Sequence, residues 1–143
     1  MKKFPPLEKV YEAWTALADN RVTMHDGYAD VSSSDGEKSY IVKFTGDKYS
    51  SDDNATFWQG YPGYPVIAVL MLQGRLPFDR DIAELWRNIN WTVLNKKFRN
   101  NYAKAVEDIA RERGINEEQS KEATEKVMES LKELPIEIKR KIS

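Results

Sequence analysis

The residues best suited to chemistry form a short polar run in the second half of the chain. They carry hydroxyl, amide or basic groups and lie off the apolar stripe of a helix predicted to begin near Trp91: Thr92, Asn95, Lys96, Lys97, Arg99 and Asn100. Asparagine can pair with adenine, arginine and lysine with guanine, and all of these side chains can contact phosphate. The run therefore predicts contact with DNA or RNA. The alternative is an ordinary solvated helix face.

The charge distribution agrees with a local binding face. The formal net charge of −1 argues against a protein that is basic throughout. Residues 75–104, however, hold seven Lys or Arg against three Asp or Glu, whereas residues 105–134 hold nine acidic against five basic residues. Such asymmetry can mark an interaction surface even when the total charge is near zero.

Catalytic groups are few. The single histidine, His25, stands beside Asp26 in a predicted turn, where a solvated role is expected rather than that of a base or ligand. A serine triad would need that histidine, and the chain has no Gly-x-Ser-x-Gly elbow, no P-loop and no dinucleotide fingerprint. The absence of cysteine excludes disulfides, thiolate zinc sites and cysteine nucleophiles. We therefore expect a non-catalytic protein without a cofactor.

One group of residues carries oxygen ligands that could hold a cation. Asp47, Asp52, Asp53 and Asn54 carry the oxygens that Ca²⁺ or Mg²⁺ prefers, but their spacing matches no calcium loop. Aspartate and asparagine also make turns unaided. No metal site is predicted, and a metal-dependent enzyme is the least favoured alternative.

The first half of the chain predicts a helix and a β-meander. Apolar residues at helical spacing follow Pro5 and Pro6 and predict an amphipathic helix: Leu7, Val10, Tyr11, Trp14, Leu17 and Ala18. Short strands are then predicted at residues 21–25, 28–33, 38–45 and 55–59. Asp26-Gly27 and Asp35-Gly36 favour two-residue hairpins, and residues 46–47 and 52–54 mark further reversals. The result is an antiparallel meander of three or four strands with one face on the helices.

An aromatic connection leads to the most apolar segment. Trp58, Tyr61 and Tyr64 form a candidate surface that could stack on a peptide or base, or a rigid joint that seals the core edge. Every position from Val66 to Leu72 is apolar, so this segment should be buried all round. A strand and a helix both fit seven residues. Pro65 before the run and Gly74 after it favour the helix.

The remaining sequence predicts three further helices. Asp79, Asn90 and Asn116 are N-cap candidates, with a tight turn at residues 88–90. One apolar stripe runs from Leu94 to Ala110 and indicates a single helix ending at Gly114. The tail at residues 136–143 alternates isoleucine with charge and is either a short edge strand or frayed.

The segment from Asp81 to Phe98, DIAELWRNINWTVLNKKF, resembles the two core helices of a helix-turn-helix transcription-factor domain. In this resemblance, which covers roughly residues 65–104, Ala83 lies at the helix crossing and Thr92 begins the recognition helix. Two departures are plain. The turn hydrophobe, Ile89, comes one residue late, and Arg87-Asn88 stands where a glycine is usual. The resemblance implies nucleic-acid contact through residues 80–104.

Together these features predict one α+β domain, with the helix and meander in residues 1–64 and a helical half in residues 65–143. The N-terminus lacks a signal-peptide core and seven apolar residues cannot span a bilayer, so a cytoplasmic protein without membrane contact is expected. The predicted function is a small non-catalytic binding domain, with DNA or RNA as the candidate ligand of residues 80–104. The alternative is a protein-interaction or homodimerisation module, because four tryptophans and seven tyrosines could also anchor an interface.

Overall fold

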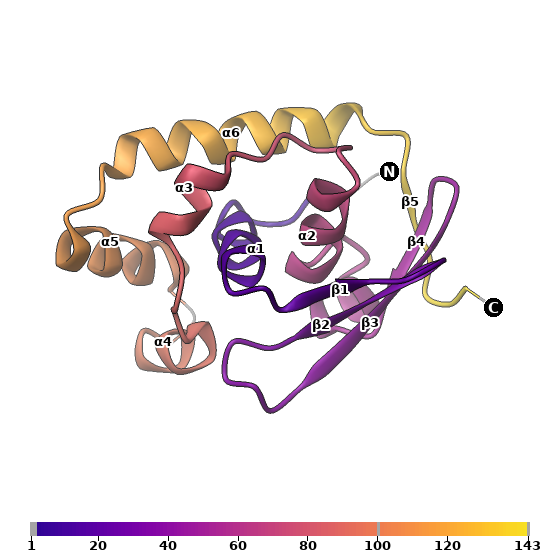
Figure 1. The fold of residues 1–143 in the computed structure, drawn as a ribbon, viewed down its shortest axis with the longest axis horizontal. Helices are drawn as coiled ribbons and strands as arrows, with labels where there is room; N and C mark the ends of the chain where they lie inside the picture. Colours follow the sequence, from indigo (N-terminus) through magenta and orange to yellow (C-terminus); the bar gives the residue numbers. More distant parts are fainter. Residues whose placement is uncertain (1–2, 100, 143) are drawn as a thin grey trace.

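The computed structural model describes residues 3–99 and 101–142 and confirms the α+β class. An N-terminal helix precedes a five-stranded, mostly antiparallel sheet, and a helical half follows (Figure 1). The elements in chain order are α1 (Glu8–Ala18), β1 (Val22–Met24), β2 (Tyr28–Ser32), β3 (Ser39–Thr45), β4 (Lys48–Ser51), the π-helical turn η1 (Ala55–Gln59), α2 (Tyr64–Leu72), α3 (Arg80–Leu85), α4 (Trp91–Lys97), α5 (Tyr102–Arg113), α6 (Glu117–Glu133) and β5 (Glu137–Ile138).

The sheet is a meander with one added strand. Its order is β1-β2-β3-β4-β5, antiparallel through β4, and β5 pairs parallel to β4. The tail thus forms an edge strand. Two-residue turns join β1 to β2 through Asp26-Gly27 and β3 to β4 through Gly46-Asp47. The two-residue hairpin predicted at Asp35-Gly36 is wrong, because Ser32 pairs with Ser39 and a longer loop lies between them.

The fourth strand is not the predicted one. Residues 55–59 form η1, and Lys48–Ser51 takes the place in the sheet. The cause is local hydrogen bonding, which competes with strand pairing. The Asp53 carboxylate accepts bonds from the Ser51 hydroxyl and, at 3.1 Å, from the Thr56 backbone N–H. The Thr56 hydroxyl in turn accepts a 2.9 Å bond from the Gly63 N–H.

The apolar segment forms helix α2, as predicted from Pro65 before it and Gly74 after it. Residues 66–71 are all buried, and the helix ends in a Schellman motif, in which Gly74 adopts φ +76° and the Arg75 N–H bonds the Leu70 carbonyl at 2.9 Å. The expectation that no position faces water is wrong at one residue. Leu72, at the end of the run, is 42% exposed.

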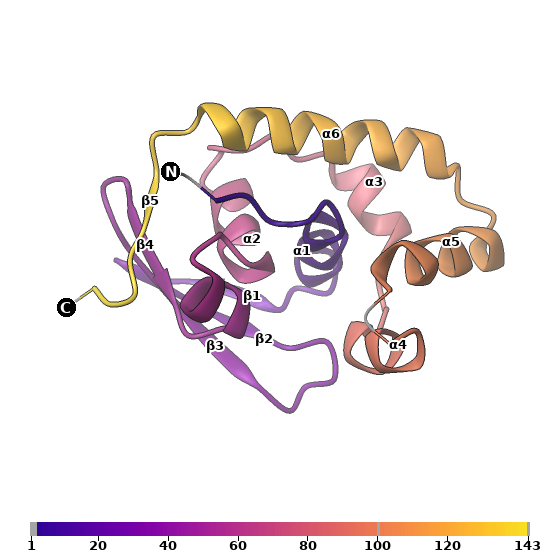
Figure 2. The ribbon, with the colours of Figure 1, turned by 180° about the vertical axis from the view of Figure 1, so that it is seen from behind.

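Helix α1 is buried more completely than an amphipathic helix. Every residue from Val10 to Leu17 is buried, Trp14 within the core among them, so the amphipathic prediction is wrong. Helices α1 and α2 lie side by side on the inner face of the sheet, and α6 runs across both (Figures 1 and 2). Thr15 ties α1 to the helical half, because its hydroxyl donates to the Trp86 carbonyl and accepts a 2.9 Å bond from the Trp91 indole.

The helical half contains the predicted caps and one unpredicted break. The side chains of Asp79, Asn90 and Asn116 accept hydrogen bonds from backbone N–H groups in the first turns of α3, α4 and α6, respectively. The single helix predicted through residue 113 is wrong. It stops at Lys97, Arg99 adopts a left-handed φ of 53°, and Asn101 caps a new helix, α5.

The turn between α3 and α4 contains a residue with a positive φ. Asn88, which stands where glycine is usual, adopts φ 54°, the left-handed conformation that asparagine tolerates better than most residues. Arg113 of α5 fixes this turn by donating to the carbonyls of Leu85, Arg87 and Asn88.

Among the described residues, no helix is long and apolar enough to cross a membrane.

Candidate functional site

A polar cavity of about 160 Å³ lies where α1, α4, the β2–β3 loop and the start of α2 meet. Figure 2 shows α4 and the loop that joins β2 to β3 as neighbours, and residues of both line the cavity. Its walls come from seven separate stretches of the chain: Lys9, Glu12, Arg21, Ser33, Ser34, Tyr40, Asp53, Asn54, Ala55, Tyr64, Trp91, Thr92 and Asn95.

A buried carboxyl forms one wall of the cavity. Glu12 is only 7% exposed, its Oε2 lies 3.2 Å from the Lys9 ammonium, and its Oε1 accepts a 3.4 Å bond from the Asn95 amide. Burial raises the pKa of Glu12, and the positive charge of Lys9 opposes that rise. For Lys9, burial lowers the pKa, but the charge and hydrogen bond of Glu12 together with Tyr102 and Tyr61 raise it, and the net shift is upward.

Arg21 and two tyrosines form the opposite wall. The Arg21 guanidinium donates to the Ser32 carbonyl, and its Nε lies 3.8 Å from an Asp19 carboxylate oxygen. Tyr40 and Tyr64 meet edge to face with ring centroids 6.3 Å apart. Burial raises the pKa of both phenols, with Arg21 opposing the rise at Tyr64. Both tyrosines therefore stay neutral near pH 7 and can donate or accept hydrogen bonds.

Helix α4 is held so that its first turn faces the cavity. The backbone N–H and the hydroxyl of Thr92 lie 3.3 and 3.4 Å from the Ser34 hydroxyl, in the β2–β3 loop. The Trp91 indole is bonded to Thr15 of α1, and Asn95 reaches Glu12 on the same helix. These contacts position Thr92 and Asn95 as cavity walls.

Hydrogen bonding in this cavity is incomplete. Across residues 3–99 and 101–142, the buried side-chain atoms without a hydrogen-bond partner are Glu12 Oε2, Arg21 Nε and Asn95 Oδ1, and all three residues line the cavity. Buried polar atoms are rarely left unpaired in folded proteins, because losing water without a replacement bond is costly. Glu12 Oε2 and Arg21 Nε keep ion-pair contacts, at 3.2 Å to the Lys9 ammonium and 3.8 Å to an Asp19 carboxylate oxygen, whereas Asn95 Oδ1 has neither a hydrogen bond nor an ion pair within the described residues. Together the three atoms indicate room for a polar guest, either ordered water or a ligand.

The polar run predicted on α4 is divided by the structure. Thr92 and Asn95 line the cavity, whereas Lys96, Lys97 and Arg99 are exposed. The Lys97 ammonium lies 5.3 Å from the centroid of the Phe98 ring. Asn100 lies outside the described residues.

The predicted aromatic group is divided as well. Tyr64 lines the cavity, and Tyr61 is half-buried. Trp58 is 64% exposed on η1, where its ring meets Phe57 edge-on and the Arg140 guanidinium lies 5.3 Å away. Trp58 and Tyr64 thus face different neighbours.

The other candidate groups have separate local contacts. His25 Nε2 lies 2.8 Å from an Asp30 oxygen, and its ring stacks on Tyr28 at 4.5 Å. Asp47 pairs with Arg75 at 2.6 Å, and Asp52 accepts a 2.8 Å bond from the backbone of β3. In the part of the chain that the structure describes, no three His, Cys, Asp or Glu residues gather as a metal site would require.

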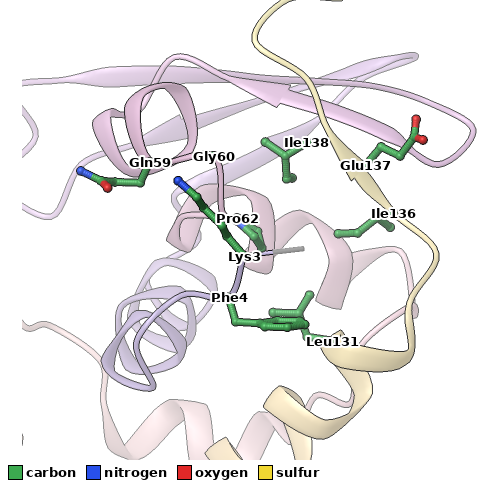
Figure 3. Close-up of a pocket in the computed structure, with 9 residues that line it drawn as sticks. All are labelled: Lys3, Phe4, Gln59, Gly60, Pro62, Leu131, Ile136, Glu137 and Ile138. Atoms are coloured by element: carbon green, nitrogen blue, oxygen red, sulfur yellow. The ribbon is translucent and has the colours of Figure 1, made fainter. Parts of the chain in front are cut away.

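A second, larger cavity of about 440 Å³ opens beside β5 and the N-terminal segment. Figure 3 shows the Phe4 ring against Leu131, with Ile136, Ile138 and Pro62 completing a mainly apolar lining. The charged groups on its rim, Lys3 and Glu137, are exposed. None of the unpartnered buried atoms described above lies here, so the polar cavity is the stronger candidate.

Sequence reasoning missed Glu12, Arg21, Ser33 and Ser34. One signal was present, because Glu12 is the only charged residue between Val10 and Ala18. A carboxylate on a helix that is otherwise apolar must be paired or neutralised if the helix is buried on all sides. Arg21, Ser33 and Ser34 lie in turns and strand ends, where such residues are ordinary.

Comparison with known proteins gives one result. The family model described as "Uncharacterised conserved protein UCP014422" matches residues 2–137. Neither the curated proteins nor the solved structures contain a match to the chain.

Proposed function

The chain belongs to this uncharacterised conserved family, and we propose that it is a small, non-catalytic binding domain whose recognition element is the polar cavity. One observation carries the proposal. The buried side-chain atoms that make no hydrogen bond, within the described ranges, all belong to residues of this one cavity, and two of them, Glu12 Oε2 and Arg21 Nε, are held only by ion pairs with Lys9 and Asp19. A ligand that pairs with them would remove the cost of leaving them unsatisfied.

The size of the cavity limits the ligand to about one ring. A cavity of roughly 150 Å³ can hold a benzene-sized molecule, and this one measures about 160 Å³. The rings of Tyr40, Tyr64 and Trp91 supply flat apolar wall between the polar groups. A single six-membered heterocycle with N–H and carbonyl groups suits both features.

The charges in the wall favour a neutral ligand. Lys9 and Arg21 are balanced by Glu12 and Asp53, and the Asp53 carboxylate is already bonded to Ser51 and Thr56. A charged guest would be buried without a free counter-charge, which is costly. A neutral ring with hydrogen-bonding edges avoids that cost.

The test is ¹⁵N NMR titration with uracil, cytosine and nicotinamide as probes. The Trp91 indole and the Asn95 side-chain amide report from the cavity wall. The Trp86 indole is the internal control, because it does not line the cavity and donates a 3.0 Å hydrogen bond to the Ser120 hydroxyl. We expect at least one probe to shift the Trp91 and Asn95 signals saturably and to leave that of Trp86 unchanged.

Two variants on one helix provide the matched comparison. Asn95→Ala removes a cavity group and should abolish the titration, whereas Val93→Ala, at a residue 57% exposed on the same helix, should preserve it. Thermal melts of both variants verify folding. Absence of any saturable shift with all three probes in the folded wild-type protein would overturn the proposal.

A further inference from the structure

We infer that the cavity holds one cytosine of a single-stranded nucleic acid while the phosphates of that strand contact the exposed basic residues of α4 and the turn after it. This inference rests on the proposed function of the cavity and names its ligand.

Helix α4 presents two kinds of groups within one turn. Thr92 and Asn95 enter the cavity wall, and Lys96, one turn beyond Thr92, is exposed to solvent. One turn of helix is about 5.4 Å, a separation that the sugar between a base and its phosphate can span. Lys97 and Arg99 are also exposed, so three cations follow within four residues of the cavity residue Asn95.

All charged residues in the surrounding segment are basic. Residues 85–106 contain five Lys or Arg and no Asp or Glu, in a chain whose net charge is −1. A local cationic stretch of this kind contacts phosphate without reading sequence. Sequence preference would then come from the cavity.

The contacts of α4 favour a single strand over a duplex. The first turn, which would read base edges in a helix-turn-helix domain, is covered, because Thr92 contacts Ser34 of the β2–β3 loop and Asn95 contacts Glu12 of α1. A base paired inside a duplex groove cannot reach atoms enclosed in this way. A base splayed out from a single strand can enter such a pocket.

The buried atoms that make no hydrogen bond match the edge of cytosine. Glu12 Oε2, which also faces the Lys9 ammonium at 3.2 Å, and Asn95 Oδ1 are two acceptors, and the cytosine amino group offers two N–H donors. Arg21 Nε is a donor, and the ring nitrogen and carbonyl of cytosine are acceptors. Uracil offers a single N–H on that edge, and a purine exceeds a cavity of about 160 Å³ sized for one ring.

The experiment is fluorescence anisotropy with labelled ten-nucleotide oligomers of C, U and A, as ribo and deoxy forms, beside cytidine measured by NMR. We expect oligo-C to bind more than tenfold tighter than cytidine at low salt, and tighter than oligo-U, oligo-A or duplex. With three phosphate contacts, the slope of log affinity against log salt should be about −2 for a single strand.

Variants separate the two parts of the inference. The triple change Lys96→Ala, Lys97→Ala and Arg99→Ala should move the salt slope towards zero and weaken oligo-C at least tenfold, without changing cytidine affinity. A charge-matched control, Arg111→Ala, Lys121→Ala and Lys126→Ala on α5 and α6, should change neither. Asn95→Ala should abolish the preference for oligo-C over the other oligomers, and with it the binding of cytidine.

Two results would overturn the inference. If a single ring binds in the cavity but oligo-C binds no tighter than cytidine and shows no salt dependence, the site takes a free small molecule and the proposed function stands without the strand. If the Asn95→Ala variant binds oligo-C as tightly as the wild-type protein does, and the wild-type protein binds duplex as tightly as oligo-C, the cations act alone and no base enters the cavity. Failure of all single-ring probes would instead refute the proposed function itself.

Discussion

Helix α2 offers a matched pair of substitutions that tests the buried centre of the fold. Leu70 is fully buried and Leu72 is 42% exposed, two residues apart on the same helix. Leu→Ala removes three carbon atoms, and at about 0.8 kcal/mol per buried methylene the transfer loss at Leu70 is roughly 2.4 kcal/mol. The cavity left behind adds to this, so we expect a total loss of about 3–5 kcal/mol.

At Leu72 the same change should cost much less. Two fifths of that side chain is already in water, which reduces the transfer loss to about 1.4 kcal/mol, and solvent fills the space left behind. We therefore expect about 1.4 kcal/mol for Leu72→Ala. Met71, which is 4% exposed, should resemble Leu70, with a loss of about 2–5 kcal/mol on changing to alanine.

Urea denaturation, followed by circular dichroism and tryptophan fluorescence, measures these losses. The dependence of the unfolding free energy on urea should be the same in all variants, which shows that the unfolded state is unchanged. Losses under about 1 kcal/mol at both Leu70 and Met71 would refute the reasoning. The same conclusion would follow if Leu70→Ala and Leu72→Ala cost equal amounts.

Three further predictions test the cavity, the η1 turn and the α3–α4 turn. Because burial raises the pKa of Glu12, its contribution to stability is complete below its ordinary value of 4.5 and is lost as pH rises through the raised value. The stability of Glu12→Gln relative to wild type should therefore increase with pH above 4.5 in urea melts, and a pH-independent difference would contradict this. Gly63→Ala should destabilise by about 2 kcal/mol or more, because a Cβ there would lie 2.2 Å from Asp53 Oδ2; a thermal melt close to that of wild type would argue against this packing. Asn88→Ala should cost about 1 kcal/mol at φ 54° whereas Asn88→Gly should cost little, and equal melting temperatures for the two would rule out the left-handed turn.

The parts of the fold with strong local chemistry were predictable. Asp79, Asn90 and Asn116 cap the helices where the sequence indicated, because an N-cap side chain acts on backbone groups two or three residues away. Gly74 ended α2 for an equally local reason. These features depend on nothing distant in the chain.

The errors arose where a periodic pattern concealed a local signal. The spacing of Leu94, Phe98 and Tyr102 fits one helix, so the capping role of Asn101 and the left-handed turn at Arg99 were not recognised. In the sheet, Lys48–Ser51 contains one large apolar residue, Tyr49, which is too few for an alternating pattern.

The cavity could be predicted only in fragments. Tyr64, Thr92 and Asn95 were named, but the polar groups that complete the site, Glu12 and Arg21, come from distant parts of the chain. A site that exists only after tertiary packing leaves no spacing in the sequence. The isolated charge of Glu12 in a buried helix was the one available clue.

The parallel pairing of β5 with β4 has a consequence for the kinetics of folding. Strands β1 to β4 are joined by successive hairpins, so each pairing closes a short loop and loses little chain entropy. Ile138 must reach Tyr49 from the far end of the sequence, which makes this the slowest pairing to form. Val127 and Leu131 of α6 belong to the same core, so docking of α6 and completion of the sheet should occur together, after the meander has formed.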